Sequence, residues 1–223
     1  MNQHDQADAP RAATSALSAI PVALFAFATF YGGMTCIAGV LGAKQVALGP
    51  LAVEAGIFPF LLLVALSSAV AELYGRGVAD RLVRLGFIPL VTAILLTFIV
   101  LQLPTDEGMY EPAKEAFPIV LGQSWRLMAA GIIAYGVSMS LNVFLFSKLS
   151  NGATKLIAVR AAIASMLSQI VDTLIFITVA FYNVRPIGDL ILGQALAKVV
   201  LSIVLVPVVI TLLVGIGRRL DRR

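Results

Sequence analysis

Apolar residues run through most of the chain, and short polar segments divide them into six stretches. A helix that crosses a bilayer needs about 20 mostly apolar residues, and each stretch is long enough to supply them. The pattern therefore predicts an all-α fold with six transmembrane helices. Their predicted ranges are about 18–41, 57–74, 87–103, 126–147, 160–181 and 187–217.

The composition agrees with that pattern. Hydrophobic residues make up 60% of the 223 residues and charged residues 13%, against about 25% charged in an ordinary soluble domain. This excludes a soluble globular domain and a disordered chain, and it indicates a polytopic integral membrane protein. We expect a polar tail at 1–17, a single membrane domain at 18–217 and a basic tail at 218–223. Any function must then be built within or between the helices.

The basic residues predict the orientation of the chain. Six spans place both termini on one side of the membrane, and eleven of the sixteen lysines and arginines fall on that side. They are Arg11, Arg76, Arg81, Arg84, Lys148, Lys155, Arg160, Arg218, Arg219, Arg222 and Arg223. Because cytoplasmic loops carry the excess of basic residues, we expect cytoplasmic termini. The positive net charge then reflects membrane orientation, and no nucleic-acid partner is expected.

Several classes of chemistry lack the residues that they need. The one cysteine is Cys36, in an apolar stretch, and the one histidine is His4, in the polar tail. Zinc, haem and histidine-based catalysis need imidazoles at depth. The chain also has no P-loop, no G-x-S-x-G and no H-E-x-x-H sequence, which are the usual marks of ATP hydrolysis, serine hydrolases and zinc proteases. We therefore expect no enzymatic activity, no cofactor and no metal.

Asp172 is the acidic residue deepest within a predicted span. It lies twelve residues after Arg160, about 18 Å along a helix, and so near the midplane, where transporters place their substrates. Ser165, Gln169 and Asp172 share one helix face, with Ser168 on its flank. This face is either a substrate or ion site or a polar clamp between helices. A midplane carboxylate without a permanent partner could also carry a proton, so proton coupling is a second hypothesis.

Other polar residues allow two interpretations. Tyr135 and Asn142 lie on one face of the fourth span. Glu72 ends the second span, where it either contacts lipid headgroups or has a functional role. Arg126, Arg160 and Lys198 lie near the ends of their spans, where such side chains usually extend to the interface.

An ordered set of short sequences resembles the vitamin uptake transporter family, whose characterised members are queuosine precursor transporters. The pieces are Phe58-Pro59, Glu72-Leu73-Tyr74-Gly75, Leu85-Gly86-Phe87, Arg126, Ala134-Tyr135, Asn142-Val143, Arg160, the run from Ser168 to Phe176, Lys198 and Pro207. The resemblance covers about residues 32–215. Ser68, Met139 and Asn142 stand where the family commonly has Asp and Gln-x-x-Asp, which removes carboxylates from the expected pocket.

The resemblance implies a multi-pass protein of the bacterial inner membrane that imports 7-cyano-7-deazaguanine, its 7-aminomethyl analogue or both, as a secondary transporter or facilitator. Asp172 or Glu72 would accept the N1–H and N2–H groups of such a base, and basic or amide side chains would donate to O6 and N7. Tyr135 and Phe176 would stack on the ring. The candidate substrate-binding residues are Asp172, Gln169, Glu72, Asn142, Tyr135, Arg160, Lys198, Arg126, Ser168 and Phe176.

Two other functions remain open at this point. The chain could be a substrate-capture subunit that needs a separate ATPase module, docking through small residues such as Ala19-x-x-x-Ala23. It could also be a non-transport membrane assembly protein. Besides the lipid bilayer and a small-molecule substrate, we expect a second copy of the chain as a partner, because a homodimer would bury more of its small-residue surface.

Overall fold

The computed structural model describes residues 20–49, 51–123, 125–150, 156–184 and 186–222. Within them, six helical segments are long and apolar enough to cross a membrane, which confirms the predicted all-α, six-span architecture in its main lines. The elements in chain order are α1 (Val22–Gly42), β1 (Gln45–Leu48), β2 (Leu51–Glu54), α2 (Ile57–Tyr74), α3 (Arg76–Leu85), α4 (Phe87–Gln102), α5 (Glu111–Leu121), α6 (Trp125–Ser150), α7 (Ile157–Phe181) and α8 (Gly188–Leu220). The predicted tail at 1–17 lies outside the described residues.

The connection between α1 and α2 departs from the all-α prediction. Strands β1 and β2 pair antiparallel there, from Gln45 opposite Glu54 to Leu48 opposite Leu51. The turn between them includes Gly49 at φ +60°, a backbone conformation that glycine adopts without steric cost. Two four-residue strands between long apolar stretches give little periodic signal, so the sequence pattern did not separate them from a loop.

The third span begins earlier than predicted. The segment that the charges suggested was a basic loop is helix α3, and it continues into α4 after Gly86 as one membrane-spanning candidate, Arg76–Gln102. Helix α3 forms because Ala79, Leu82 and Val83 recur at helical spacing and are buried together, while its charged residues lie on the other face. The acidic loop that follows α4 likewise contains a helix, α5.

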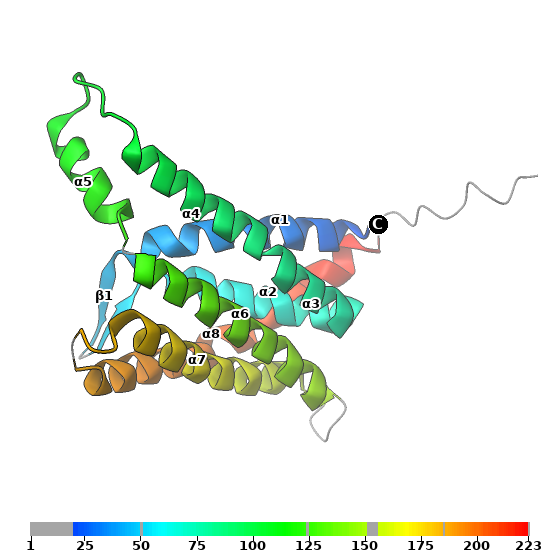
Figure 1. The fold of residues 1–223 in the computed structure, drawn as a ribbon. Helices are drawn as coiled ribbons and strands as arrows, with labels where there is room; N and C mark the ends of the chain where they lie inside the picture. The colour runs from blue at the N-terminus through cyan, green and yellow to red at the C-terminus, as the bar shows by residue number, and fades with distance from the viewer. Residues whose placement is uncertain (1–19, 50, 124, 151–155, 185, 223) are drawn as a thin grey trace, which may run out of the picture.

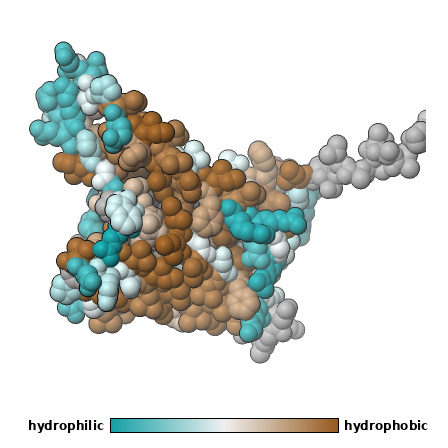
Figure 2. Space-filling view, in the orientation of Figure 1, coloured by the Kyte–Doolittle hydropathy of each residue, from teal (hydrophilic) through white to brown (hydrophobic). Residues whose placement is uncertain are grey.

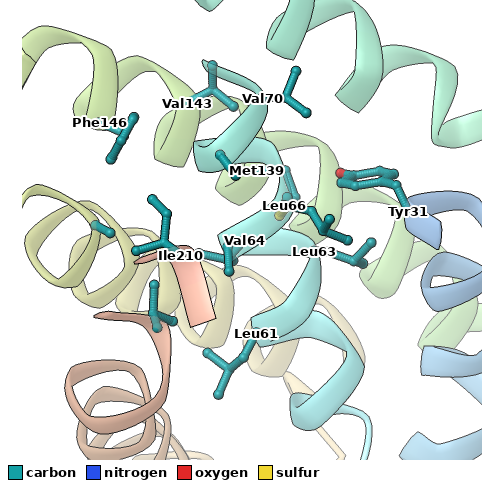
Figure 3. Close-up of a cluster of buried hydrophobic side chains, with 14 of the residues drawn as sticks. Tyr31, Leu61, Leu63, Val64, Leu66, Val70, Met139, Val143, Phe146 and Ile210 are labelled. Atoms are coloured by element: carbon teal, nitrogen blue, oxygen red, sulfur yellow. The ribbon is translucent and has the colours of Figure 1, made fainter. Parts of the chain in front are cut away.

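Four helices form a closed ring: α7 contacts α6 and α8, and α2 also contacts α6 and α8. Figure 3 shows apolar side chains from this ring meeting in one cluster, with Tyr31 of α1 at its edge. Helix α1 packs on α2. Helix α4 has no buried residue, and Figure 1 shows α4 and α5 leaning away from the other helices.

The bundle has two different ends. One end, called here the hairpin end, carries β1, β2 and α5, and the other, the termini end, holds the start of α1 and the end of α8 (Figure 1). Asp221 joins elements at the termini end, because its carboxylate accepts hydrogen bonds from the Ala23 backbone N–H and from the Tyr74 hydroxyl. Figure 2 shows an apolar belt between polar ends, as a membrane-spanning protein requires.

Gly86 permits a close approach at the α3–α4 junction. A Cβ atom there would lie 2.2 Å from the Tyr135 hydroxyl, 2.7 Å from the Tyr31 ring and 3.1 Å from the Val83 carbonyl oxygen. Those same groups are hydrogen-bonded to one another: the two tyrosine hydroxyls are 2.9 Å apart, and Tyr135 donates to the Val83 carbonyl at 3.1 Å. A side chain at this position must therefore displace a buried network.

Gly86→Ala is expected to lower the free energy of unfolding by about 1–3 kcal/mol, the usual cost of overpacking a core. Unfolding of the purified protein in detergent by heat or denaturant measures it. Gly77→Ala on α3 is the matched control, because a Cβ atom there meets nothing within 4 Å. Equal stability of the two variants would show that the junction is not tightly packed.

Candidate functional site

A cavity of about 240 Å³ lies between α1, α2, α4, α6, α7 and α8 and reaches from the hairpin end to Asp172 and Lys198. Most of its wall is apolar, with Phe60, Ile94 and Met128 among the lining side chains. Its volume is somewhat below the roughly 300–1,000 Å³ of pockets for drug-sized ligands. The cavity therefore suits a small molecule with a largely apolar surface and a few polar groups.

An ion pair lies at the inner end of this cavity. The Lys198 ammonium is 2.9 Å from Asp172 Oδ2, and the Ser138 hydroxyl donates to Asp172 Oδ1 at 3.1 Å. The side chains of Asp172 and Lys198 are 9% and 10% exposed. Three helices thus meet at one polar point: α6 supplies Ser138, α7 supplies Asp172 and α8 supplies Lys198.

The pair corrects one premise of the sequence analysis. The proton hypothesis assumed an Asp172 without a permanent partner, and the structure gives it Lys198. Lys198 does not extend to the interface, because it lies ten residues inside α8 and faces the bundle. Each charge stabilises the other in a region of low dielectric, so both can face the cavity as ions.

Two predicted aromatic residues also line the cavity. Phe176 lies one helical turn beyond Asp172 on α7, and Tyr135 lies on α6. The Tyr135 ring is held edge-on against Phe87, with ring centroids 5.0 Å apart and planes at 84°. Because its hydroxyl is already bonded to Tyr31 and Val83, Tyr135 offers the cavity its ring. Four of the ten predicted residues therefore lie together here: Asp172, Lys198, Tyr135 and Phe176.

Three more predicted residues lie deeper in the ring of helices, outside the cavity lining. Asn142 donates to the Val64 carbonyl and to the Ser68 hydroxyl of α2 at 3.3 and 3.0 Å. Ser168 donates to the Ser165 carbonyl within its own helix. Gln169 is fully buried.

The last three predicted residues, Glu72, Arg160 and Arg126, do not line the cavity. Glu72 and Arg160 form an ion pair at 2.5 Å toward the termini end, and the Arg160 guanidinium lies 4.4 Å from the centre of the Phe146 ring. Arg126 donates to the carbonyls of Val179 and Tyr182 at the end of α7, each at 2.7 Å. A cation is favourable there because helix C-terminal carbonyls lack partners within the helix.

The cavity also contains polar residues that the sequence analysis did not select: Thr35, Cys36, Glu54, Thr97 and Gln123. Gln123 donates to the Gly39 carbonyl at 2.8 Å and ties the segment after α5 to α1. Thr35 and Cys36 are among the few polar groups of the first apolar stretch, which was a usable signal. Gln123 follows a loop helix that the pattern did not predict, so nothing pointed to it. In the described part of the chain, no three His, Cys, Asp or Glu side chains come together as a metal site requires.

Comparisons of the sequence with known proteins show the family to which the chain belongs. The sequence profile of the family described as "Putative vitamin uptake transporter" matches residues 54–212. The chain belongs to this vitamin uptake transporter family. It is also 28% identical, over 148 residues, to the "Probable queuosine precursor transporter" of Bacillus subtilis (strain 168). That alignment covers 61% of each chain, so the match spans about three-fifths of the relative's length. No solved structure matches.

Membership of the vitamin uptake transporter family fixes the broad class. Together with the six apolar helices, it makes the chain a multi-pass membrane protein of a transporter family, and in a bacterium such a protein lies in the inner membrane. The family match begins at Glu54 and ends before the end of α8. It therefore includes Asp172 and Lys198.

Proposed function

We propose that the chain imports 7-deazaguanine precursors of queuosine, 7-cyano-7-deazaguanine or 7-aminomethyl-7-deazaguanine, as a secondary transporter or facilitator. The observation that carries the proposal is the Asp172–Lys198 pair at the inner end of a small apolar cavity. The Bacillus subtilis relative, named a probable queuosine precursor transporter, supports the substrate class. The proposed path runs from the periplasm, at the hairpin end, to the cytoplasm, at the termini end, as the distribution of basic residues predicts.

The pair matches one edge of a guanine-like base. Such a base presents the O6 acceptor beside the N1–H and N2–H donors. Each carboxylate oxygen has two lone pairs, so Asp172 can accept from N1–H and N2–H while it keeps Ser138 and Lys198. Lys198 has three donors and can give one to O6. The flat rings would then lie between apolar walls, with Tyr135 and Phe176 beside them.

A competition binding assay with the purified protein tests this recognition. We expect both deazaguanines to bind and guanine to compete, because all three present the same donor and acceptor edge. Adenine is the matched control, since it presents an N6 donor and no N1–H, and we expect it not to compete. Binding of adenine as tight as that of guanine, or no binding of either deazaguanine, would contradict the proposal.

The capture-subunit alternative loses one of its supports. In the suggested docking pair, Ala23 is fully buried within the chain, so it is not available to a partner, and Ala19 lies outside the described residues. The assembly-protein alternative leaves the buried ion pair without a use. The homodimer stays a proposal. A measurement of the mass of the protein in detergent tests it.

A further inference from the structure

The ring formed by α2, α6, α7 and α8 contains buried polar groups that the cavity does not reach. We call four of them the inner cluster: Asn142, Ser165, Gln169 and Ser202. Each is 0% exposed. Five side-chain atoms of this cluster have no hydrogen-bond partner among the described residues: both amide atoms of Gln169, the hydroxyls of Ser165 and Ser202, and the side-chain carbonyl oxygen of Asn142. A buried polar group without a partner costs about 1–3 kcal/mol, so this concentration of them needs an explanation.

The helix registers place the inner cluster on the far side of the ion pair from the cavity. Ser138, Asp172 and Lys198 are hydrogen-bonded to one another and so lie at one level. Asn142 and Ser202 follow Ser138 and Lys198 by four residues on helices that run toward the termini end. Gln169 precedes Asp172 by three residues on α7, which runs the other way. All three steps lead about 4.5–6 Å toward the termini end.

Ser165 lies one helical turn further in the same direction, and beyond it the Glu72–Arg160 ion pair joins α2 to α7. The exposed fractions of the two paired side chains are 19% and 5%. Along the length of the helices, from the hairpin end to the termini end, the order is therefore the cavity, the Asp172–Lys198 pair, the inner cluster and the Glu72–Arg160 pair.

We propose that the inner cluster is a second binding position, which the substrate occupies after it leaves the outer cavity and before the Glu72–Arg160 pair parts to release it. The identity of the substrate rests on the proposed function. A glutamine amide pairs with a cyclic amide edge, accepting its N–H and donating to its C=O. Gln169 therefore complements the N1–H and O6 groups of a deazaguanine, and the hydroxyls of Ser165 and Ser202 can serve the remaining groups.

The cluster differs from a purely structural clamp. The Asn142 amide nitrogen shows what a clamp looks like, since it contacts three acceptors on α2. The Gln169 amide makes no such bond within the described residues. A neutral, mixed set of donors and acceptors also fits the neutral ring of a deazaguanine better than it fits an inorganic ion.

The first test separates binding from passage. Gln169→Met keeps the volume of the side chain and removes both amide atoms. We expect outer-cavity affinity within about threefold of the wild type, less than the 1.4 kcal/mol of a tenfold change, and uptake into liposomes lowered at least tenfold. Gln194→Met is the matched control: Gln194 is also buried, with its carbonyl oxygen unpartnered in the described residues, but it lies outside the cavity lining and the cluster. Uptake by Gln169→Met equal to that by Gln194→Met overturns the proposal.

The second test does not depend on the substrate. In a Cys36→Ser background, the thiol introduced by Ser165→Cys is expected to react with a thiol reagent applied from the termini end, and faster when Glu72→Gln weakens the ion pair. Ala164→Cys is equally buried but turned by about 100° around α7, and we expect it to stay unreactive. Equal reactivity of the two thiols, with and without Glu72→Gln, overturns the inner position. Failure of all deazaguanine binding together with a reactive Ser165→Cys thiol would overturn only the proposed substrate.

Discussion

Asp172→Asn is expected to lower deazaguanine uptake by about 100-fold. The change removes the charged acceptor of the N1–H and N2–H groups. Hydrogen bonds to charged groups contribute about 1.5–3 kcal/mol each. Removing the charge from the acceptor of these two hydrogen bonds therefore costs about 3 kcal/mol, which corresponds to about a 100-fold change in affinity. Uptake of labelled precursor into cells, at matched amounts of protein in the membrane, measures the effect. Glu115→Gln on the exposed surface of α5 is the control and should transport normally.

The same substitution also leaves Lys198 buried without its partner, which costs about 3–5 kcal/mol of stability in typical cases. The double variant Asp172→Asn/Lys198→Met separates the two effects, because it removes the unpaired charge. We expect the double variant to regain most of the stability, measured by thermal unfolding in detergent, and to remain inactive in uptake. Recovery of uptake by the double variant would show that the pair is only structural.

Modification of Cys36 is expected to stop uptake. Cys36 is half-buried, lines the cavity and is the one cysteine of the chain. A charged thiol reagent that cannot cross the membrane should reach it from the periplasmic side, because the cavity lies toward the hairpin end. The attached group then fills part of a cavity of about 240 Å³, and uptake by intact cells should fall to the level of cells without the protein.

A deazaguanine added first should slow this modification, because substrate and reagent compete for the same space. Cys36→Ser is the control: serine can keep the contact that the thiol makes with the Pro89 carbonyl, so the variant should transport and resist the reagent. Labelling only from the cytoplasmic side would contradict the proposed orientation. Labelling that leaves uptake intact would contradict the role of the cavity.

The spans could be predicted because a membrane imposes length and apolarity on them. Elements that do not have to be long and apolar carry no such signal, and they were missed. Helix α3 carries several charges and looks like a loop when only apolar runs are counted, and the β1–β2 hairpin is too short to show an alternating pattern. The end of the bundle at which Arg126 lies was predictable, but the direction of its side chain was not. The pairing of Lys198 with Asp172 inside the bundle was not predictable either.

The site was predicted in part. Asp172 was identifiable because an acidic residue is costly within a span. Lys198 was singled out near the end of its span, where extension to the interface was the usual expectation, and the family resemblance added it to the substrate-binding candidates. The apolar wall of the cavity could not be predicted, because Leu90 and Ile94 would look the same in the sequence if they faced lipid. Gln169 and Arg160 lie only three and twelve residues before Asp172, yet the structure divides these polar groups between a cavity, a buried cluster and a second ion pair.

Uptake by the purified protein in liposomes that contain no other protein tests whether this chain transports a deazaguanine by itself. We expect labelled 7-cyano-7-deazaguanine or its 7-aminomethyl analogue to enter without ATP, faster than in protein-free liposomes and faster than with Asp172→Asn. Tight binding without entry would contradict transport by this chain alone and would favour a capture subunit that needs an ATPase module. Absence of both binding and entry would contradict the substrate class itself.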